Sequence, residues 1–315
     1  MVVVAIAGAT GGVGKTVIEE IHATAPHHKV YVLGRNAPSQ PTSGSVEFLK
    51  VDYSNVESLT KVLEDHAVDT IISTINLETD AGSEAQLGLI AAADKSKTTR
   101  RFIPSEFVSY IDEDDPNSGP GMGGWVPNAR ALKKTSLEYI RISVGFFTDY
   151  WGIPNIKTSL RPFRWFIDME KGEAAIPGTG DERFTVTYSV DLAKAIVKLL
   201  DMQESWPKHG HLSGSDVTLN ELVAHAEKLQ GSKFKVVYDP QEKLERGEVT
   251  LLWTPDEVPA EEFKVLFLSI CQLIVSGACI LPQDGNQLTR IFPDLRLTTA
   301  QEILTEAWGG QRLTG

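Results

Sequence analysis

Short apolar runs rich in β-branched residues alternate with helix-like segments through the first half of this sequence. Residues 2–6 read VVVAI, and residues 28–34 and 46–51 have the same character. In residues 56–66, by contrast, apolar side chains recur along one side of a helix. The expected strands are 2–6, 28–34, 46–51, 69–75, 101–104 and 137–143, and the expected helices are 15–21, 56–66, 85–95, 190–201 and 220–230.

Strands that alternate with helices predict a parallel sheet with right-handed crossovers, wound on both faces. We therefore expect an α/β protein with a Rossmann-type doubly wound parallel sheet and a smaller C-terminal α+β substrate lobe. The expected domains are residues 1–153, with 178–202 packing back on them, and residues 154–315. Residues 111–126 are acidic and glycine-rich, which is typical of a mobile loop, and both a lid and a plain surface excursion fit them.

A glycine motif joins the first expected strand to the first expected helix. Gly8, Gly11 and Gly14 form a GxxGxxG turn, and such a turn lets backbone N–H groups approach a dinucleotide pyrophosphate at a helix N-terminus. The rival motif is the nucleotide-binding loop GxxxxGK[ST], because Lys15 and Thr16 follow Gly14. That motif requires glycine at position 9, where this chain has alanine, so an NTPase is disfavoured.

The end of the second strand indicates which dinucleotide is bound. An NAD site places a carboxylate there for the ribose hydroxyl, whereas this chain has Arg35, whose planar cation suits a 2′-phosphate. NADP(H) is therefore the expected cofactor. Because ligands lie at the carboxyl ends of parallel strands, the expected cofactor-binding residues are Gly8, Thr10, Gly11, Gly12, Val13, Gly14, Arg35, Asp52, Thr74, Ile75, Asn76 and Ser105.

Composition narrows the possible classes. The net charge of −12 over 315 residues disfavours a nucleic-acid surface. Cys271 and Cys279 have neither metal-ligand nor redox spacing, so we expect buried thiols and no metal site. The first strand begins too early to leave room for a signal peptide, and the longest apolar stretch, residues 265–275, is too short for a bilayer. We expect a cytoplasmic protein that contacts no membrane.

Several sequence segments resemble those of the NmrA-like and isoflavone-reductase-like family of atypical short-chain dehydrogenases, most of all its fungal secondary-metabolism branch. They are residues 8–14, 101–107, 145–151, 175–178 and 292–299, and together they span nearly the whole chain. The resemblance implies an NADP-binding Rossmann domain with a small substrate lobe. The family includes reductases of phenylpropanoid-type molecules as well as cofactor-binding regulators, so fold alone does not decide activity.

The resemblance departs at the catalytic lysine, which family reductases carry on the helix before the sixth strand. Here that helix is expected to be short, with Pro127 near its start. Lys133 and Lys134 either replace the family lysine or are solvated. Glu106 is either catalytic or a structural carboxylate that caps backbone amides. The candidate catalytic residues are Ser105, Glu106, Tyr110, Lys133 and Lys134.

Aromatic residues cluster after the sixth strand and would give an aromatic or alkaloid-like substrate a flat apolar surface. The expected pocket residues are Phe107, Phe146, Phe147, Tyr150, Trp151, Trp165 and Phe166. The first of three possible functions is an NADPH-dependent reductase of a C=N or iminium, C=C or C=O bond in a small natural product. The second is a cofactor-holding cyclase or isomerase with a coupled redox step. The third is a non-catalytic NADP-sensing regulator with a protein partner. An iminium would accept hydride without a general acid.

Overall fold

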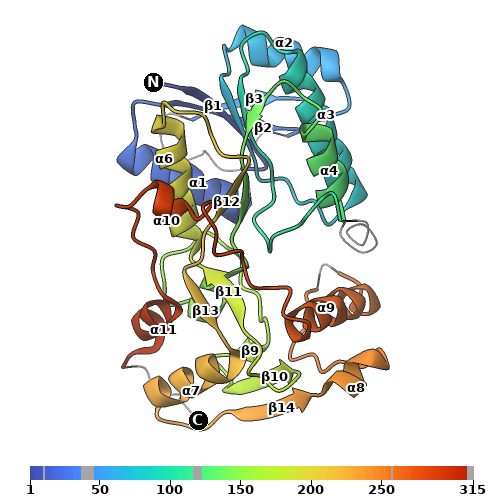
Figure 1. Ribbon diagram of the computed structural model, residues 1–315, viewed down its shortest axis with the longest axis vertical. Coiled ribbons are helices and arrows are strands. Elements are labelled where there is room, and N and C mark those ends of the chain that lie inside the picture. Colours follow the sequence, from blue (N-terminus) through green and yellow to red (C-terminus); the bar gives the residue numbers. More distant parts are fainter. Residues whose placement is uncertain (10, 37–45, 116–122, 257, 311–315) are drawn as a thin grey trace. The chain divides into compact units, whose positions relative to one another are not determined.

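The computed structural model describes residues 1–9, 11–36, 46–115, 123–256 and 258–310. The chain divides into two compact units, each assembled from three stretches of sequence (Figure 1). Unit 1 comprises Met1–Ser143, Leu192–His211 and Asp284–Leu295, and unit 2 comprises Val144–Asp191, Leu212–Gln283 and the chain from Arg296. In the described part of the chain, no helix is both long and apolar enough to cross a bilayer.

A six-stranded sheet forms the centre of unit 1, with every neighbouring pair of strands parallel. The strand order is β3-β2-β1-β4-β5-β6, which is the order of the doubly wound dinucleotide-binding fold. The expected fold class is therefore confirmed. In that order the strands are Glu47–Lys50, Lys29–Gly34, Val3–Ala7, Thr70–Ser73, Arg101–Ile103 and Glu138–Tyr139.

Helices cover both faces of this sheet, with α1 and α6 on one side and α3 and α4 on the other (Figure 1). The central strand β1 is buried from Val4 to Ala7, and its neighbours β2 and β4 are buried along most of their lengths. Burial on both faces explains why these strands are continuous apolar runs. The helices of this unit are α1 (Gly12–Thr24), α2 (Val56–Asp65), α3 (Asp80–Lys95), α4 (Trp125–Leu132), most of α6 (Ser189–Asp201) and α10 (Leu288–Ile291).

Two of the departures from the expected elements have clear local reasons. Helix α3 begins five residues early because the Thr79 side chain caps it by accepting from the Gly82 N–H at 3.1 Å. The expected strand 137–143 divides at Ile140 into β6 and β7 (Arg141–Ser143), and β7 pairs in parallel with β12 (His209–His211) instead of β5. This break places Arg141 beyond the main sheet.

Unit 2 is a mixed α+β unit around an aromatic core. Its two three-stranded sheets have the orders β14-β10-β9 and β13-β11-β8. The strands are β8 (Phe146–Phe147), β9 (Ile167–Asp168), β10 (Glu173–Pro177), β11 (Phe184–Thr187), β13 (Ser215–Val217) and β14 (Lys235–Asp239). The helices are α5 (Asp149–Gly152), α7 (Leu219–Gln230), α8 (Gln241–Glu245), α9 (Ala260–Val275) and α11 (Ala300–Trp308).

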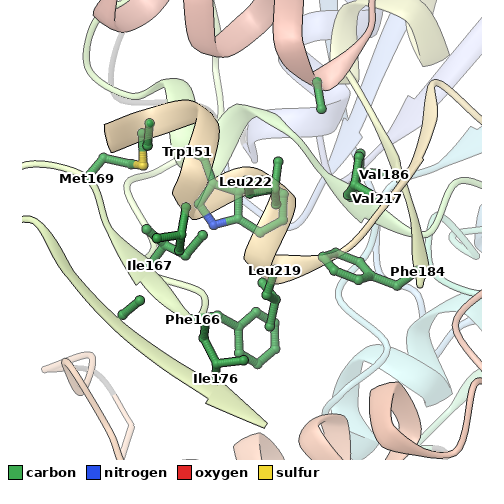
Figure 2. Close-up of a cluster of buried hydrophobic side chains, with 14 of the residues drawn as sticks. Trp151, Phe166, Ile167, Met169, Ile176, Phe184, Val186, Val217, Leu219 and Leu222 are labelled. Atoms are coloured by element: carbon green, nitrogen blue, oxygen red, sulfur yellow. The ribbon is translucent and has the colours of Figure 1, made fainter. Parts of the chain in front are cut away.

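Trp151 is a central member of the unit 2 core and is 1% exposed (Figure 2). Its indole N–H donates to the Trp165 carbonyl at 2.8 Å, and its own carbonyl accepts from the Trp308 indole at 2.7 Å. Cys271 and Cys279 are buried free thiols in the same core, as expected. Hydrogen bonds between tryptophans and neighbouring backbone thus fix the packing of α5 and α11.

Candidate functional site

The glycine turn after β1 is shaped by close contact with the end of β4. Gly8 has a φ of +79°, and a Cβ at this position would stand 2.6 Å from the Thr74 carbonyl oxygen. The Gly11 N–H then donates to the Gly8 carbonyl at 2.9 Å, which closes the turn. Only glycine combines this backbone conformation with this close approach.

Helix α1 begins directly after the turn, at Gly12. Among the described residues, no side chain caps its first N–H groups, and its first turn holds no carboxylate. The Gly14 position lies against β4, where a Cβ would stand 2.6 Å from the Thr74 hydroxyl oxygen. A helix N-terminus with uncapped donors and no side chain in the way fits the pyrophosphate of a dinucleotide. Thr10 lies outside the described residues.

The carboxyl ends of the neighbouring strands meet at the same edge of the sheet as this turn. Arg35 follows β2 and is exposed, and its guanidinium makes no hydrogen bond or ion pair with any residue in the described ranges. Asp52, after β3, accepts from the Ser54 N–H at 3.0 Å and hydroxyl at 2.6 Å, and the hydroxyl bond lowers the pKa of this carboxyl. An available cation therefore lies where an NAD site would have a carboxylate.

The ends of β4 and β5 complete this edge. Thr74 is fixed by its hydroxyl, which donates to the Ala7 carbonyl at 2.8 Å. Asn76 is exposed and accepts from the Glu78 N–H at 2.9 Å. The Ser105 N–H donates to the buried Gln86 side chain at 2.9 Å. The structure thus brings Gly8, Gly11, Gly12, Val13, Gly14, Arg35, Asp52, Thr74, Ile75, Asn76 and Ser105 to the carboxyl ends of β1 to β5.

A buried charge cluster lies beyond β5, and sequence reasoning identified only one of its members. Arg141 donates from Nε to Glu106 Oε2 at 2.6 Å and from Nη1 to Glu113. All three side chains are at most 10% exposed. Of the two roles left open for Glu106, capping of backbone amides does not match the structure, because its partner among the described residues is a guanidinium. The sequence signal for Arg141 was weak: a cation between two isoleucines of an expected strand.

Burial dominates the titration of Glu106. It raises the pKa of this carboxyl to about 7, although Arg141 opposes the shift. Burial also acts to raise the pKa of Glu113, but backbone N–H groups and Arg141 outweigh it and lower that pKa. Glu106 and Glu113 thus share one guanidinium, and burial favours a proton on Glu106.

The two candidate lysines follow α4, an eight-residue helix that confirms the expected shortening, with Pro127 at its third position. Both lysines are exposed. Lys133 lies 3.6 Å from Glu113 and forms a shorter ion pair with Asp114, whose carboxylate raises the pKa of the ammonium group. Lys133 thus holds the acidic segment after β5.

The remaining candidates of unit 1 differ in exposure. Tyr110 is 36% exposed, and its ring lies edge-on to His209 at 5.6 Å and to His211 at 5.4 Å. Burial, followed by Asp112 and Glu113, raises the pKa of its phenol, which therefore keeps its proton at neutral pH. Phe107 is 8% exposed and belongs to the core.

The expected pocket aromatics of unit 2 fall into two groups. Trp151, Phe166 and Phe147 are buried, and Phe166 has a φ of +56°, a conformation that bulky residues rarely adopt. Phe146, Tyr150 and Trp165 are only half-buried. Trp165 stacks on Phe267 of α9 with ring centres 5.8 Å apart and planes within 8°. The half-buried rings therefore form a partly exposed aromatic surface next to the buried core. Phe163 and Trp253 also belong to this surface, and the sequence did not reveal them.

One group of residues in the described ranges has the spacing of metal ligands: His27, His28 and Asp201. The Val2 N–H donates to His28 Nδ1 at 3.1 Å, so the proton of the neutral ring lies on Nε2, the atom that faces Asp201. Burial lowers the pKa of His28 and favours this neutral form. A protonated Nε2 is no metal ligand. The group is better described as an exposed His27–Asp201 hydrogen bond of 3.0 Å beside a buried neutral His28.

Comparisons with known proteins agree with this geometry. The model of the NmrA-like family matches residues 2–262. The chain is 31% identical to the oxidoreductase swnN of Metarhizium robertsii over 98% of both chains, and 26% identical to eugenol synthase 1 of Petunia hybrida over 95% of this chain and 96% of that one. The leucoanthocyanidin reductase–NADPH complex of Vitis vinifera has the same fold, with a TM-score of 0.72 at 22% identity over 97% of this chain and 99% of that one.

Proposed function

Because this chain belongs to the NmrA-like family, we propose that it is an NADPH-dependent reductase of a small aromatic or alkaloid-like molecule. The observation that carries the proposal is the glycine turn, where a Cβ on Gly8 or Gly14 would strike Thr74 while the first donors of α1 stay uncapped. A relative named as an oxidoreductase supports a redox reaction, and a solved NADPH complex of the same fold supports this cofactor.

In this proposal unit 1 binds the dinucleotide. The N–H groups of Gly12 and Val13 hold the pyrophosphate, with no opposing carboxylate in the first turn of α1. Arg35 binds the 2′-phosphate with its exposed guanidinium. Thr74, Asn76 and Ser105 line the edge along which the nicotinamide half extends. When bound, NADPH supplies a hydride.

Unit 2 supplies the substrate's apolar surroundings. The half-buried rings of Phe146, Tyr150 and Trp165 offer flat surface for an aromatic molecule. The strained backbone at Phe166 fixes the chain direction on either side, including that of its neighbour Trp165. We propose that residues 1–153 bind the cofactor and that residues 154–315 recognise the substrate.

The type of bond that this chain reduces can be inferred from which side chains are able to donate a proton. Lys133 is an exposed ammonium group engaged by Glu113 and Asp114. A substrate that already carries positive charge, such as an iminium, accepts hydride at carbon and needs no proton, so it suits this chain best. Reduction of C=O or C=C would need a proton donor, for which Tyr110 keeps its proton at neutral pH.

The same observation on Lys133 favours a second candidate, a cofactor-holding cyclase or isomerase, which also needs no lysine acid. A non-catalytic NADP-sensing regulator is the third. NADPH and NADH titrations followed by nucleotide fluorescence test the cofactor, and NADPH consumption with cyclic iminium ions, phenylpropanoid alkenes and aromatic ketones tests the reaction. Stoichiometric NADPH oxidation with an iminium supports the proposal. Product without net NADPH loss points to the isomerase, and tight NADPH binding with no turnover of any class points to the regulator.

A further inference from the structure

Residues 104–115, here called the post-β5 segment, leave the carboxyl end of β5 at the cofactor edge and carry four of the candidate residues. This segment contains no helix or strand. Its second residue, Ser105, is fixed by Gln86, and beyond that point the segment depends on side chains for its position. The residue that contacts most of it is Arg141.

Arg141 binds the post-β5 segment at three separate places. It donates to Glu106 near the start at 2.6 Å, to the Ile111 carbonyl in the middle at 3.0 Å, and to Glu113 near the end. Its side chain is 4% exposed. Because a guanidinium is planar and always charged, one residue of β7 can thus fix three positions of an irregular segment at once.

An ionised Glu106 is only partly compensated in this cluster. It shares Arg141 with Glu113, and its Oε1 is buried and has no hydrogen-bond partner among the described residues. The last turn of α4 neutralises the outer end, because Arg130 donates to the Glu113 carbonyl at 2.9 Å and Lys133 pairs with Glu113 and Asp114. Glu106 lies at the inner end, and Arg141 is its only ion-pair partner within the described ranges.

We infer that Arg141 is a positioning residue for the cofactor edge, and that one proton on Glu106 sets how firmly it holds the post-β5 segment. With Glu106 protonated, its buried carboxyl carries no charge and Arg141 holds the segment closed. With Glu106 ionised, the cluster holds a buried charge with an oxygen unpartnered in the described ranges, and the segment opens more readily because opening returns that carboxylate to water. The inference rests on the proposed function only for its link to NADPH.

Burial supports this assignment by raising the pKa of Glu106 to about 7, so the change falls in the physiological range. The groups that face the cluster come from every neighbouring element. They are Arg141 of β7, His209 of β12, Tyr139 of β6, Arg130 of α4 and Lys133 after it, Asp284, and Tyr110, Asp112, Glu113 and Asp114 of the segment itself. Burial and Arg141 lower the pKa of His209 and favour its neutral form, and the Glu106→Gln variant separates any titration of His209 from that of Glu106.

Two readouts at pH 6, 7 and 8 test the inference: amide hydrogen exchange of residues 104–115, corrected for intrinsic rates, and NADPH affinity by fluorescence. In the wild type, we expect protection of the segment to fall by roughly threefold or more from pH 6 to pH 8, because the proton that Glu106 holds in the closed segment is lost over this range, with NADPH affinity following it. Glu106→Gln should hold both readouts at their pH 6 values throughout. Arg141→Lys should lower protection at every pH.

Glu138→Gln is the matched control, because Glu138 pairs with Arg101 at 2.6 Å in the same sheet but lies outside the segment. It should leave the pH dependence of both readouts unchanged. A pH dependence that persists in Glu106→Gln, or that Glu138→Gln also abolishes, overturns the inference. If the wild type binds no NADPH, the proposed function fails, and hydrogen exchange still decides the role of Arg141. Should Arg141→Lys not fold, the isosteric Glu106→Gln still decides the proton linkage.

Discussion

The Thr74 hydroxyl occupies the space that a side chain on Gly14 would need. The hydroxyl is held there by its 2.8 Å bond to the Ala7 carbonyl, and a Cβ on Gly14 would stand 2.6 Å from its oxygen. The end of β4 therefore determines how closely α1 approaches the sheet. The glycine is required by this contact between two elements far apart in sequence, and not by its own φ.

Gly14→Ala should accordingly separate α1 from β4 and displace the N–H groups proposed to bind pyrophosphate. We expect a loss of about 1–3 kcal/mol in the free energy of unfolding, as for overpacked core sites, and a more than roughly tenfold weaker NADPH affinity. Urea denaturation and fluorescence titration measure the two. Gly285→Ala is the control, since a Cβ there meets nothing within 4 Å. Equal effects of the two substitutions would contradict this account.

Arg35→Ala should reduce affinity for NADPH far more than for NADH. A charge-assisted bond to phosphate contributes about 1.5–3 kcal/mol, so NADPH affinity should fall by roughly 10- to 100-fold. NADH has no 2′-phosphate and should bind as before. Lys61→Ala removes another exposed cation, one paired with Asp65 on α2, and should change neither affinity. Equal losses of affinity for both nucleotides would show that Arg35 does not bind the 2′-phosphate.

Neither lysine after α4 is expected to be the proton donor. Lys133→Ala and Lys134→Ala should each retain kcat within about threefold, whereas loss of a general acid costs roughly 100-fold or more. Lys133→Ala should additionally increase hydrogen exchange near Asp114, because it removes that carboxylate's ion pair. Steady-state kinetics on the substrate found in the NADPH-consumption screen decides the matter. A 100-fold fall in kcat for either variant would show that this lysine has the role of the family's catalytic lysine.

Stability should depend on pH through Glu106 in the opposite sense to an ordinary surface carboxylate. Its pKa is raised from 4.5 to about 7 on folding, so between these values the folded state binds more protons than the unfolded state. The free energy of unfolding therefore falls as pH rises from about 4.5 to 7 and levels off above, by at most on the order of 3 kcal/mol.

Glu106→Gln isolates this contribution. We expect the wild type to lose stability relative to the variant as pH rises. The unfolding free energies of both proteins, measured in urea at pH 5, 6, 7 and 8, give this difference. A difference that is constant across this range would show that Glu106 does not take up its proton on folding.

Trp151→Phe should destabilise unit 2 without touching unit 1. It leaves the Trp165 carbonyl without its 2.8 Å donor and opens a void in the core, which together cost about 2–4 kcal/mol. Trp206→Phe removes a comparable 2.9 Å bond to the Leu199 carbonyl in unit 1. Proteolysis of unit 2 peptides should accelerate in the first variant only, and acceleration in both would argue against separate cores.

The sequence was most informative where one local rule decides the structure. Apolar runs predicted the strands of unit 1, and Pro127 predicted the short α4. Thr79 was less visible, because a capping threonine outside the apolar pattern shifts a helix start without changing its periodicity. The strand break at Ile140 was missed because β6 and β7 have the same residue character and differ only in the partner strand.

The candidate site followed the same logic. The glycine turn and Arg35 could be placed because strand ends share one edge in a parallel sheet. The cluster of Arg141, Glu106 and Glu113 could not, since it joins residues 28 and 35 positions apart through a segment without regular structure. Likewise, nothing in the sequence distinguished the buried Trp151 from the half-buried Trp165, because tertiary packing alone decides which ring is enclosed.

The three-part construction of each unit has a consequence for how the protein is made. Unit 1 takes its last piece from Asp284–Leu295, after almost all of unit 2 has been encoded. A ribosome must therefore translate most of the message before every piece of unit 1 is available to pack.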